Sequence, residues 1–239
     1  MIPSISVLTA LGPHVAHHLA DTAQSVLGQT LSGSQTWQWV ICIDGPPMPL
    51  DVPDDPRIVV IAAGRPGGPG LCRNLAAAHA DAPLLRNLDA DDLLLPGALA
   101  SDIAALADPT IGWTTSAARD LLPDGSVRDV AGASPGRMVP VGDIARQWAG
   151  GPIIDVHVTT VAMRAETLWA AGGYTALPRS EDVSLLARIN LTSRGRHRSS
   201  VSLLYRKWSQ QLTEQPRDET NRRVRERMSA AMLAALDRP

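Results

Sequence analysis

The stretch from Leu84 to Leu95, L-L-R-N-L-D-A-D-D-L-L-L, constrains the fold of this chain more than any other. Its first apolar run, 84–88, has the length of a buried strand of an α/β sheet. Asp89, Asp91 and Asp92 follow this run directly, and in such sheets ligands bind outside the carboxyl ends of the strands. The stretch therefore predicts a strand that delivers carboxylates to a cleft.

Three carboxylates within four residues repel one another, and a divalent cation among them would relieve that repulsion. Oxygen-only ligands favour Mg²⁺ or Mn²⁺, which share their sites with substrate phosphates. The alternative is a solvated turn, or acids that cap the helix expected after Pro96. A calcium loop needs glycine at its sixth position and glutamate at its twelfth, but Leu94 and Ala100 stand there.

Composition limits the chemistry that the chain can perform. Its 239 residues, 44% of them hydrophobic, suffice for one domain, and 22 Lys plus Arg against 24 Asp plus Glu leave no nucleic-acid footprint. Lysine occurs once, at Lys207, which excludes a G-x-x-x-x-G-K-[ST] phosphate loop. Arginine must therefore supply nearly all cationic side chains, and an arginine-rich, alanine-rich chain suggests GC-rich bacterial coding DNA.

The remaining composition predicts a cytoplasmic protein. Cys42 and Cys72 lie in apolar contexts and are expected to be buried free thiols rather than a disulfide framework. An apolar strand is expected almost at the start, at 5–8, so no signal peptide is expected, and no apolar run reaches the ~18 residues that a membrane span needs.

Hydrophobic periodicity predicts alternating strands and helices, which argues for a largely parallel, helix-covered sheet. A hairpin over 121–130, turning at Asp124-Gly125, is the first antiparallel element. The Gly- and Pro-rich residues 131–152 are expected to form a loop over the site. The expected strands are 5–9, 37–43, 57–62, 84–88, 111–117, 157–163 and 201–205; the expected helices are 15–29, 71–80, 96–106, 165–171, 183–189 and 213–236.

Several polar residues should meet on one rim of this sheet. Thr9, Asp44 and the acids after residue 88 all follow strands. The glycine-rich loop 64–70 opens a helix that carries Arg73, and helix N-termini attract phosphate. An anion explains Arg73 better than the helix dipole does, although a surface arginine is the alternative.

Two histidine- and acid-containing segments have simpler alternatives. Glu181 and Asp182 begin a helix after Ser180, an expected N-cap, and the dipole alone would favour acids there. His14, His17 and His18 could share a helix face, but no cysteine or acid at ligand spacing supports a zinc site.

Seven segments together resemble the family 2 glycosyltransferases of GT-A fold, over roughly Ile5 to Leu212. They are S-V-L-T at 6–9, Q-S-V-L-G-Q-T at 24–30, W-V-I-C-I-D-G at 39–45, L-C-R-N-L-A-A-A-H-A at 71–80, N-L-D-A-D-D at 87–92, A-A-G-G-Y at 170–174 and S-E-D-V-S-L-L-A-R-I at 180–189.

The resemblance implies an α/β fold of GT-A type, with a mostly parallel central sheet flanked by helices and a smaller antiparallel element on the acceptor side. It implies a single domain over 1–212, with a nucleotide-binding half at 1–92 and an acceptor half at 93–212. A helical tail at 213–239 would follow.

The resemblance also implies roles for individual residues. Thr9, Asp44, Arg73, Asp89 and Asp91 would contact the nucleotide sugar, Asp44 at the base or ribose. Asp91, with Asp89, would hold the Mn²⁺ or Mg²⁺ that bridges the diphosphate, acting as a Lewis acid.

The same family pattern assigns the chemistry to the later acids. Asp182 would be the general base that takes a proton from the acceptor, with Glu181 orienting it. The displacement would invert the configuration at the anomeric carbon of the sugar, with no glycosyl-enzyme intermediate.

One segment departs from the family pattern. Many members carry a histidine after the last strand that helps hold the metal or diphosphate, and Trp208 stands there in this chain. Arg206 or Lys207 would then contact the diphosphate instead, and Trp208 could stack on a sugar or acceptor ring.

The sequence thus predicts an inverting, metal-dependent hexosyl- or N-acetylhexosaminyltransferase with a nucleotide-sugar donor, a UDP-sugar being favoured. The acceptor would be a small molecule, a glycan or a peptide. A nucleotidyltransferase is one alternative, although Leu11-Gly12-Pro13-His14 is a poor match to its glycine-rich loop. A non-catalytic sugar-nucleotide-binding protein of the same fold is the other.

Overall fold

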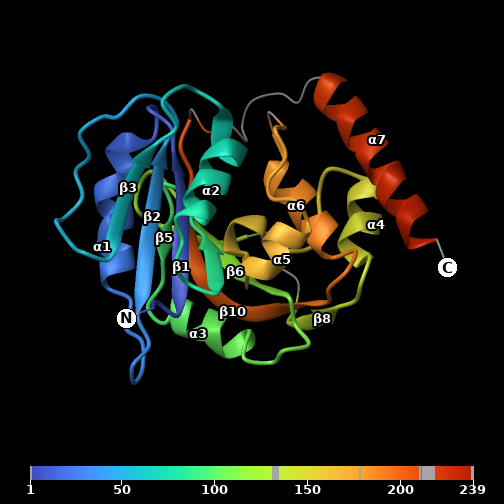
Figure 1. Cartoon of the computed structure of the whole chain (residues 1–239), viewed down its shortest axis with the longest axis horizontal. Coiled ribbons are helices and arrows are strands. Elements are labelled where there is room, and N and C mark those ends of the chain that lie inside the picture. Colours follow the sequence, from blue (N-terminus) through green and yellow to red (C-terminus); the bar gives the residue numbers. More distant parts are fainter. Residues whose placement is uncertain (1, 131–134, 178, 210, 212–218, 238–239) are drawn as a thin grey trace.

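The computed structural model describes residues 2–130, 135–177, 179–209, 211 and 219–237, and within them one ten-stranded sheet is flanked by helices (Figure 1). The main strand order is β3-β2-β1-β4-β9-β6-β10-β5, with β7 paired to β6 and β8 paired to β10. The longer strands are β1 Ile5–Leu11, β2 Trp37–Ile43, β3 Ile58–Ala62, β4 Leu84–Asn87, β6 Trp113–Leu121 and β10 Gly195–Arg206; the shorter ones are β5 Leu93–Leu94, β7 Val127–Asp129, β8 Arg137–Val139 and β9 Ala162–Arg164.

All six longer strands point the same way, which confirms the mostly parallel sheet. β1 is parallel to β2 and β4, and β2 is parallel to β3. β9 is antiparallel to both β4 and β6, so β6 runs in the direction of β4, and β10 is parallel to β6. The carboxyl ends of these strands therefore lie at one edge of the sheet.

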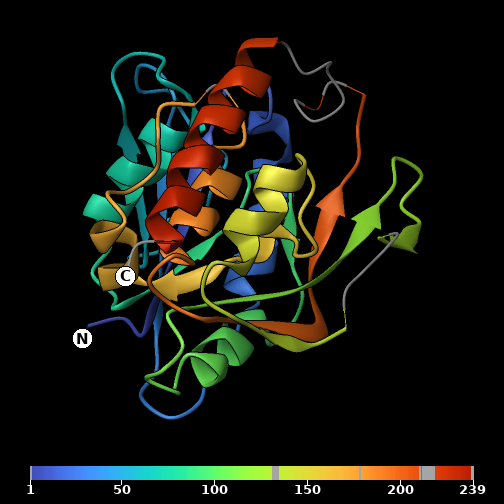
Figure 2. The same ribbon diagram turned by 90° about the vertical axis from the view of Figure 1, so that its right-hand side faces the viewer.

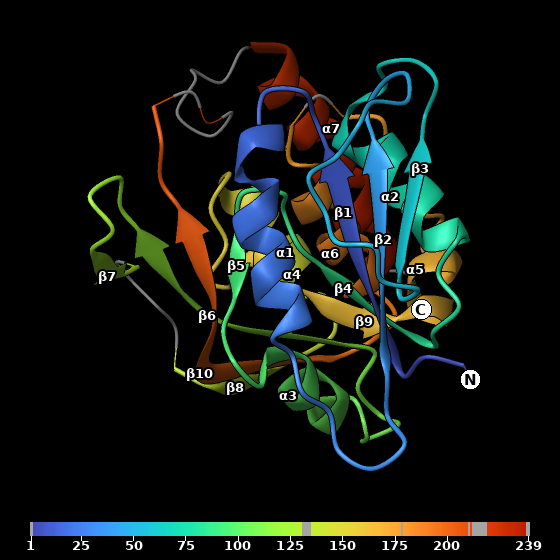
Figure 3. The same ribbon diagram turned by 90° about the vertical axis from the view of Figure 1, so that its left-hand side faces the viewer.

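Helices cover both faces of the sheet. The helices are α1 Leu19–Leu27, α2 Gly68–Ala78, α3 Ala98–Ala105, α4 Asp143–Gly150, α5 Ala165–Ala170, α6 Glu181–Ile189 and α7 Glu219–Leu236, with 3-10 turns η1 Ala16–His18 and η2 Val158–Thr160. Figure 3 shows α1 in front of the sheet and α2, α5 and α6 behind it.

Each face of the sheet has its own hydrophobic core, because side chains alternate along a strand. In β2, Trp39 and Ile41 pack into the core beneath α1 and α3. Val40 and Cys42 of the same strand pack into the core shared with α2 and α6. Cys42 and Cys72 are buried free thiols, as expected.

The strand β2 begins and ends where the sequence predicts, and most other elements do so within a few residues. The segment 131–152 is different, because β8 and α4 lie where a loop was expected, while 131–134 are outside the described residues. The sequence around α4 is rich in glycine, but Ile144, Ala145 and Trp148 bury one helix face. That buried face stabilises a short helix that local composition disfavours.

Four smaller expectations also need correction. The helix predicted over 15–29 is a 3-10 turn followed by the shorter α1, and the strand predicted over 157–163 is η2 followed by β9. The last strand begins at Gly195 rather than residue 201. Ser180 precedes α6 as expected, but its φ of 62° is left-handed and its side chain makes no capping hydrogen bond.

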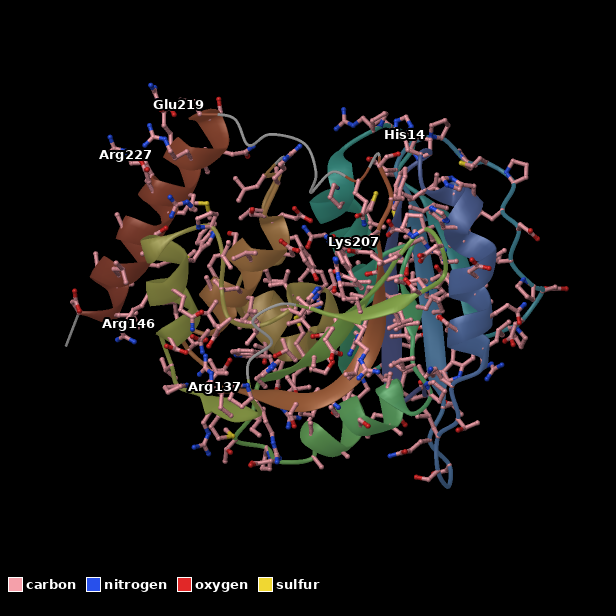
Figure 4. The ribbon with its side chains drawn as sticks, turned by 180° about the vertical axis from the view of Figure 1, so that it is seen from behind. His14, Arg137, Arg146, Lys207, Glu219 and Arg227 are labelled. Atoms are coloured by element: carbon pink, nitrogen blue, oxygen red, sulfur yellow. The ribbon has the colours of Figure 1, made fainter. Side chains whose placement is uncertain are left out.

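The tail helix α7 packs along α4 (Figure 2). Met232 is buried in the core of that face, and Arg225 Nη1 donates a hydrogen bond to the Trp148 carbonyl at 2.8 Å. Glu219 and Arg227 lie at the periphery (Figure 4). No helix of the described residues is both long and apolar enough to cross a membrane.

A buried ionic cluster ties β4 to α3 and β10, and no sequence pattern pointed to it. Arg86 of β4 and Asp102 of α3 have fully buried side chains, with Nη1 2.8 Å from Oδ2. Asp102 Oδ1 also pairs with Arg198 of β10, and Arg86 Nη2 donates to Ser202 Oγ at 3.2 Å. Arg86 stands three residues before the acidic turn, so the cluster anchors the strand that carries the turn.

Candidate active site

The acidic turn lies at the end of β4, as predicted. The amide of Leu88 donates to the Leu8 carbonyl at 3.0 Å, which extends the pairing with β1 to the last residue before the turn. The amide of Asp92 donates to the Asp89 carbonyl at 3.1 Å and closes the turn. Asp89 is partly exposed, whereas Asp92 is fully buried.

Two carboxyl groups of this turn have raised pKa values. Burial and the neighbouring Asp89 raise the pKa of Asp91. Burial, Asp89 and Asp91 raise the pKa of Asp92 well above its ordinary value. Asp92 Oδ1 accepts a hydrogen bond from the Arg206 amide at 2.9 Å, but Oδ2 is buried with no partner among the described residues.

Arg73 joins the acidic turn to the helix α6. Its Nη2 lies 2.6 Å from Asp89 Oδ1, and its Nη1 lies 2.5 Å from Glu181 Oε1. The arginine and the glutamate side chains are each only 7% exposed. Because the three residues come from three different segments, this bridge brings the two predicted acidic motifs onto one rim.

The partners of Arg73 correct its sequence-based interpretation. The anion expected beside it is supplied by the protein itself, through Asp89 and Glu181. Arg73 also lies in the second turn of α2, not the first, because the helix begins at Gly68. Arg73 contacts Asp89, and its predicted position near a nucleotide stays a prediction.

Asp182 is mostly buried beside this bridge. Burial raises the pKa of Asp182 to about 7, Glu181 adds to the shift, and Arg73 opposes it. Its Oδ1 accepts a hydrogen bond from the Val183 amide at 2.7 Å. A carboxyl with a pKa near neutrality suits a general base.

A second set of contacts fixes the segment before α6 onto α2, and only the A-A-G-G-Y motif hinted at it. Asn74 exchanges two hydrogen bonds with the backbone of Tyr174, at 2.8 and 3.0 Å. The Tyr174 hydroxyl donates to Asn87 Oδ1 at 2.6 Å. A Cβ on Gly70 would lie 2.7 Å from the Thr175 carbonyl oxygen, so glycine allows this close approach.

Asp44 lies at the end of β2, as predicted, but it caps α2. Its carboxylate accepts hydrogen bonds from the amides of Gly67 at 2.6 Å and Gly68 at 3.1 Å. The helix N-terminus that was expected to attract phosphate is thus occupied by a carboxylate of the chain itself.

Thr9 supports the rim from below. It is fully buried, its hydroxyl donates to the Leu88 carbonyl at 2.9 Å and accepts from the Trp39 indole at 2.9 Å. Both of its hydrogen bonds hold the protein together, and the contact of Thr9 with a nucleotide sugar stays a prediction.

The segment after β10 lies beside the acidic turn, and each of its predicted ligand contacts has a partner in the protein. Trp208 Nε1 donates to Asp91 Oδ2 at 2.8 Å, so tryptophan contacts the carboxylate at the position of the family's histidine. Its ring packs edge-on against His17 and His18, at 5.8 and 5.5 Å between centroids.

The two cations of this segment point to other acids. Arg206 Nη2 lies 2.8 Å from Asp21 Oδ2, and its Nε donates to the Asp91 carbonyl at 2.8 Å. Lys207 Nζ lies 3.8 Å from Asp120 Oδ1, and Figure 4 shows it near the middle of the molecule. These contacts use only some of the N–H donors of the two side chains, so their contact with a diphosphate stays a prediction.

The donor set of the turn fits a hard divalent cation. The described residues contain no cluster of three or more side chains that could hold a metal ion. Magnesium, however, is commonly bound by one or two carboxylates together with substrate phosphates and water. Burial and Asp89 raise the pKa of Asp91, and Asp92 Oδ2 is buried with no partner among the described residues. A cation bound at the turn would stabilise the charged form of these carboxylates.

Comparison with known proteins places the fold. No family model and no curated protein matches the sequence. S. aureus TarS 1–349 in complex with UDP-GlcNAc matches with a TM-score of 0.76 at 14% identity, over 99% of this chain and 68% of that chain.

The same part of TarS with UDP gives a TM-score of 0.70 at 14% identity, over 99% and 67% of the two chains. A longer TarS structure gives 0.65 at 14% identity, over 85% of this chain and 37% of that one. At such identity the likeness establishes the fold: an α/β fold with a mixed, mostly parallel sheet flanked by helices.

Proposed function

We propose that this chain is a family 2 glycosyltransferase that moves a sugar from a nucleotide-sugar donor to an acceptor hydroxyl with inversion. The observation that supports the proposal is the Asp89–Arg73–Glu181 bridge, because it joins the acidic turn to the start of α6, where Asp182 has a raised pKa. The likeness to TarS bound to UDP-GlcNAc and to UDP supports a UDP-sugar, with a hexose or N-acetylhexosamine as the sugar.

The chemistry follows from the position of Asp182. The acceptor oxygen forms a bond to the anomeric carbon, and the bond from that carbon to the diphosphate oxygen breaks, its electron pair leaving with the nucleoside diphosphate. Asp182 takes the acceptor proton. Glu181, held by Arg73, lies beside Asp182 and adds to the upward shift of the pKa of Asp182.

Asp89 and Asp91 would hold the divalent metal ion, Mn²⁺ or Mg²⁺. When bound, such an ion offsets negative charge that develops on the leaving diphosphate. Trp208 restrains one oxygen of Asp91 through its hydrogen bond. Asp92, which hydrogen-bonds to the Arg206 amide, holds the far side of the turn.

Calorimetric titration of UDP, GDP and dTDP, with and without Mn²⁺, tests the donor site. We expect one nucleotide, UDP, to bind in a Mn²⁺-dependent manner, and Asp91→Ala to weaken it by about tenfold or more because a charged ligand is lost. The matched control is Asp54→Ala, which removes an exposed carboxylate elsewhere in the chain. Absence of binding by all three nucleotides would contradict the proposed function.

The pH dependence of kcat/KM tests Asp182 in the free enzyme. A general base must be deprotonated, and burial with Glu181 raises the pKa of Asp182 to about 7. We therefore expect kcat/KM to rise with pH and to level off above about 7. The sign for stability is opposite: a raised carboxyl pKa stabilises the folded state at acidic pH, and this contribution is lost as pH rises toward 7. A flat profile between pH 5 and 8 would count against Asp182 as the base.

A further inference from the structure

A cavity of about 720 Å³ lies beside the candidate active site, between β6, the end of α4 and the segment 151–157. This volume falls within the range of small-molecule sites, roughly 300 to 1,000 Å³. Most of its lining is apolar and comes from Ala117, Ala118, Val130, Pro152, Ile153, Ile154 and Val156.

Polar contacts hold the wall of this cavity in place. Arg137 Nη2 lies 2.9 Å from Asp143 Oδ2 and 2.6 Å from Asp155 Oδ2, so it ties α4 to the segment 151–157. The Asp155 amide donates to Gln147 Oε1 at 2.8 Å. Figure 4 shows Arg137 low in the molecule, on the side of α4 and β8. The cavity is therefore pre-formed, which reduces the entropy cost of binding.

The floor of the cavity offers few hydrogen bonds to a ligand. Thr115 Oγ1 and His197 Nδ1 are paired at 2.9 Å on this face of the sheet. Because these two groups are already paired, the floor presents mainly the methyl group of Ala117, the β6 side chain that faces α4. The hydroxyl groups of a polyhydroxylated ligand would lose their hydrogen bonds to water there and gain none from the protein, which costs free energy. An apolar ring has no such hydrogen bonds to lose.

His157 lines the cavity and lies close to the candidate active site. The turn η2, which follows His157, packs against α6 and β4, the elements that carry Asp182 and the acidic turn. The ring of His157 lies 5.1 Å from that of Tyr205, and its nearby charges include Asp89. A ligand in the cavity would thus have its His157 end toward the acids.

His157 supplies a neutral hydrogen-bonding group at that end. Burial lowers the pKa of His157 to about 4, so the ring is uncharged at neutral pH. Its Nδ1 is paired with Thr159 Oγ1 at 2.7 Å. Among the described residues no hydrogen bond reaches Nε2, which can therefore contact a hydroxyl group of a ligand.

We infer that this cavity binds the acceptor substrate, and that the acceptor is a small molecule with an apolar ring that carries the reacting hydroxyl. The inference rests on the proposed function and narrows it, because it disfavours a polyhydroxylated acceptor such as a glycan. The apolar body fills the space over Ala117 and beside Ile154 and Val156, and the hydroxyl lies at the His157 end.

Binding of two phenols, 4-methylumbelliferone and 1-naphthol, to the full chain tests this inference, with ribitol and N-acetylglucosamine as polyhydroxylated probes. We expect saturable binding of the phenols only. Ala117→Trp fills the cavity and should weaken phenol binding by about tenfold or more. Ala104→Trp adds the same side chain on the exposed face of α3 and should leave it unchanged.

UDP binding with Mn²⁺, measured on the same samples, separates the two proposals. If wild type binds UDP but neither phenol, or binds ribitol or N-acetylglucosamine saturably instead, the acceptor inference is overturned and the donor site stands. Equal phenol affinity in Ala117→Trp and wild type also overturns it. If no nucleotide binds, the proposed function itself fails. Retained UDP binding by Ala117→Trp shows that this variant is folded.

Discussion

Replacement of Asp182 by asparagine is expected to lower kcat by about 10²- to 10⁴-fold, the usual contribution of a general base. Asparagine keeps the size of the side chain and an oxygen atom that can accept the hydrogen bond from the Val183 amide, which is 2.7 Å long to Asp182 Oδ1. It cannot take a proton from the acceptor. The measurement is steady-state transfer from a UDP-sugar, with UDP affinity determined in parallel and expected to stay within a few fold.

Two comparisons make the Asp182 result specific. Asp237→Asn removes an exposed carboxylate beyond α7 and should leave kcat unchanged. The rise of kcat/KM toward pH 7 should disappear in Asp182→Asn, because the titrating group is gone. A variant that retains both wild-type kcat and the wild-type pH profile would show that another group accepts the proton.

Substitution of Asp102 by alanine is expected to lower the free energy of unfolding by about 3–5 kcal/mol, the usual cost of removing one partner of a buried ion pair. Asp102 is fully buried and is the shared partner of Arg86 and Arg198, so both guanidinium groups would lose their counter-charge. Urea denaturation followed by far-ultraviolet circular dichroism measures the change.

The matched control for Asp102 is an exposed ion pair. In the pair of Arg119 and Asp129 the side chains are 48% and 79% exposed, and Asp129→Ala should change stability by less than about 1 kcal/mol. If Asp102→Ala cost no more than this control, the buried cluster would not anchor β4. Because β4 carries the acidic turn, Asp102→Ala should also weaken UDP binding wherever part of the protein remains folded.

The strands and the edge that they share could be predicted from the sequence. Along β2, buried residues alternate between two cores, and the strand is observed where the pattern predicted it. Local patterns were less informative for α4, because glycine-rich surroundings conceal a helix that three buried side chains stabilise. They were also less informative for β10, whose first half pairs with β6 and β8.

The hydrogen-bond or ion-pair partner of each charged group could not be predicted from local sequence patterns. Asp44 was predicted at a strand end and lies there, but its carboxylate caps α2. Arg73 was expected to meet a ligand anion and instead pairs with Asp89 and Glu181, the latter 108 residues away in the chain.

What the sequence by itself determined is therefore the α/β class, the position of the acidic turn after a buried strand, and the acids at the start of α6. These depend on periodicities that reach only a few residues along the chain. The tertiary structure alone decided that Arg73 joins the two acidic segments, that Trp208 contacts Asp91, and that Arg86 and Arg198 share Asp102. The physical reason is that electrostatic and hydrogen-bonding partners are chosen by distance in space, which the packing of distant segments sets.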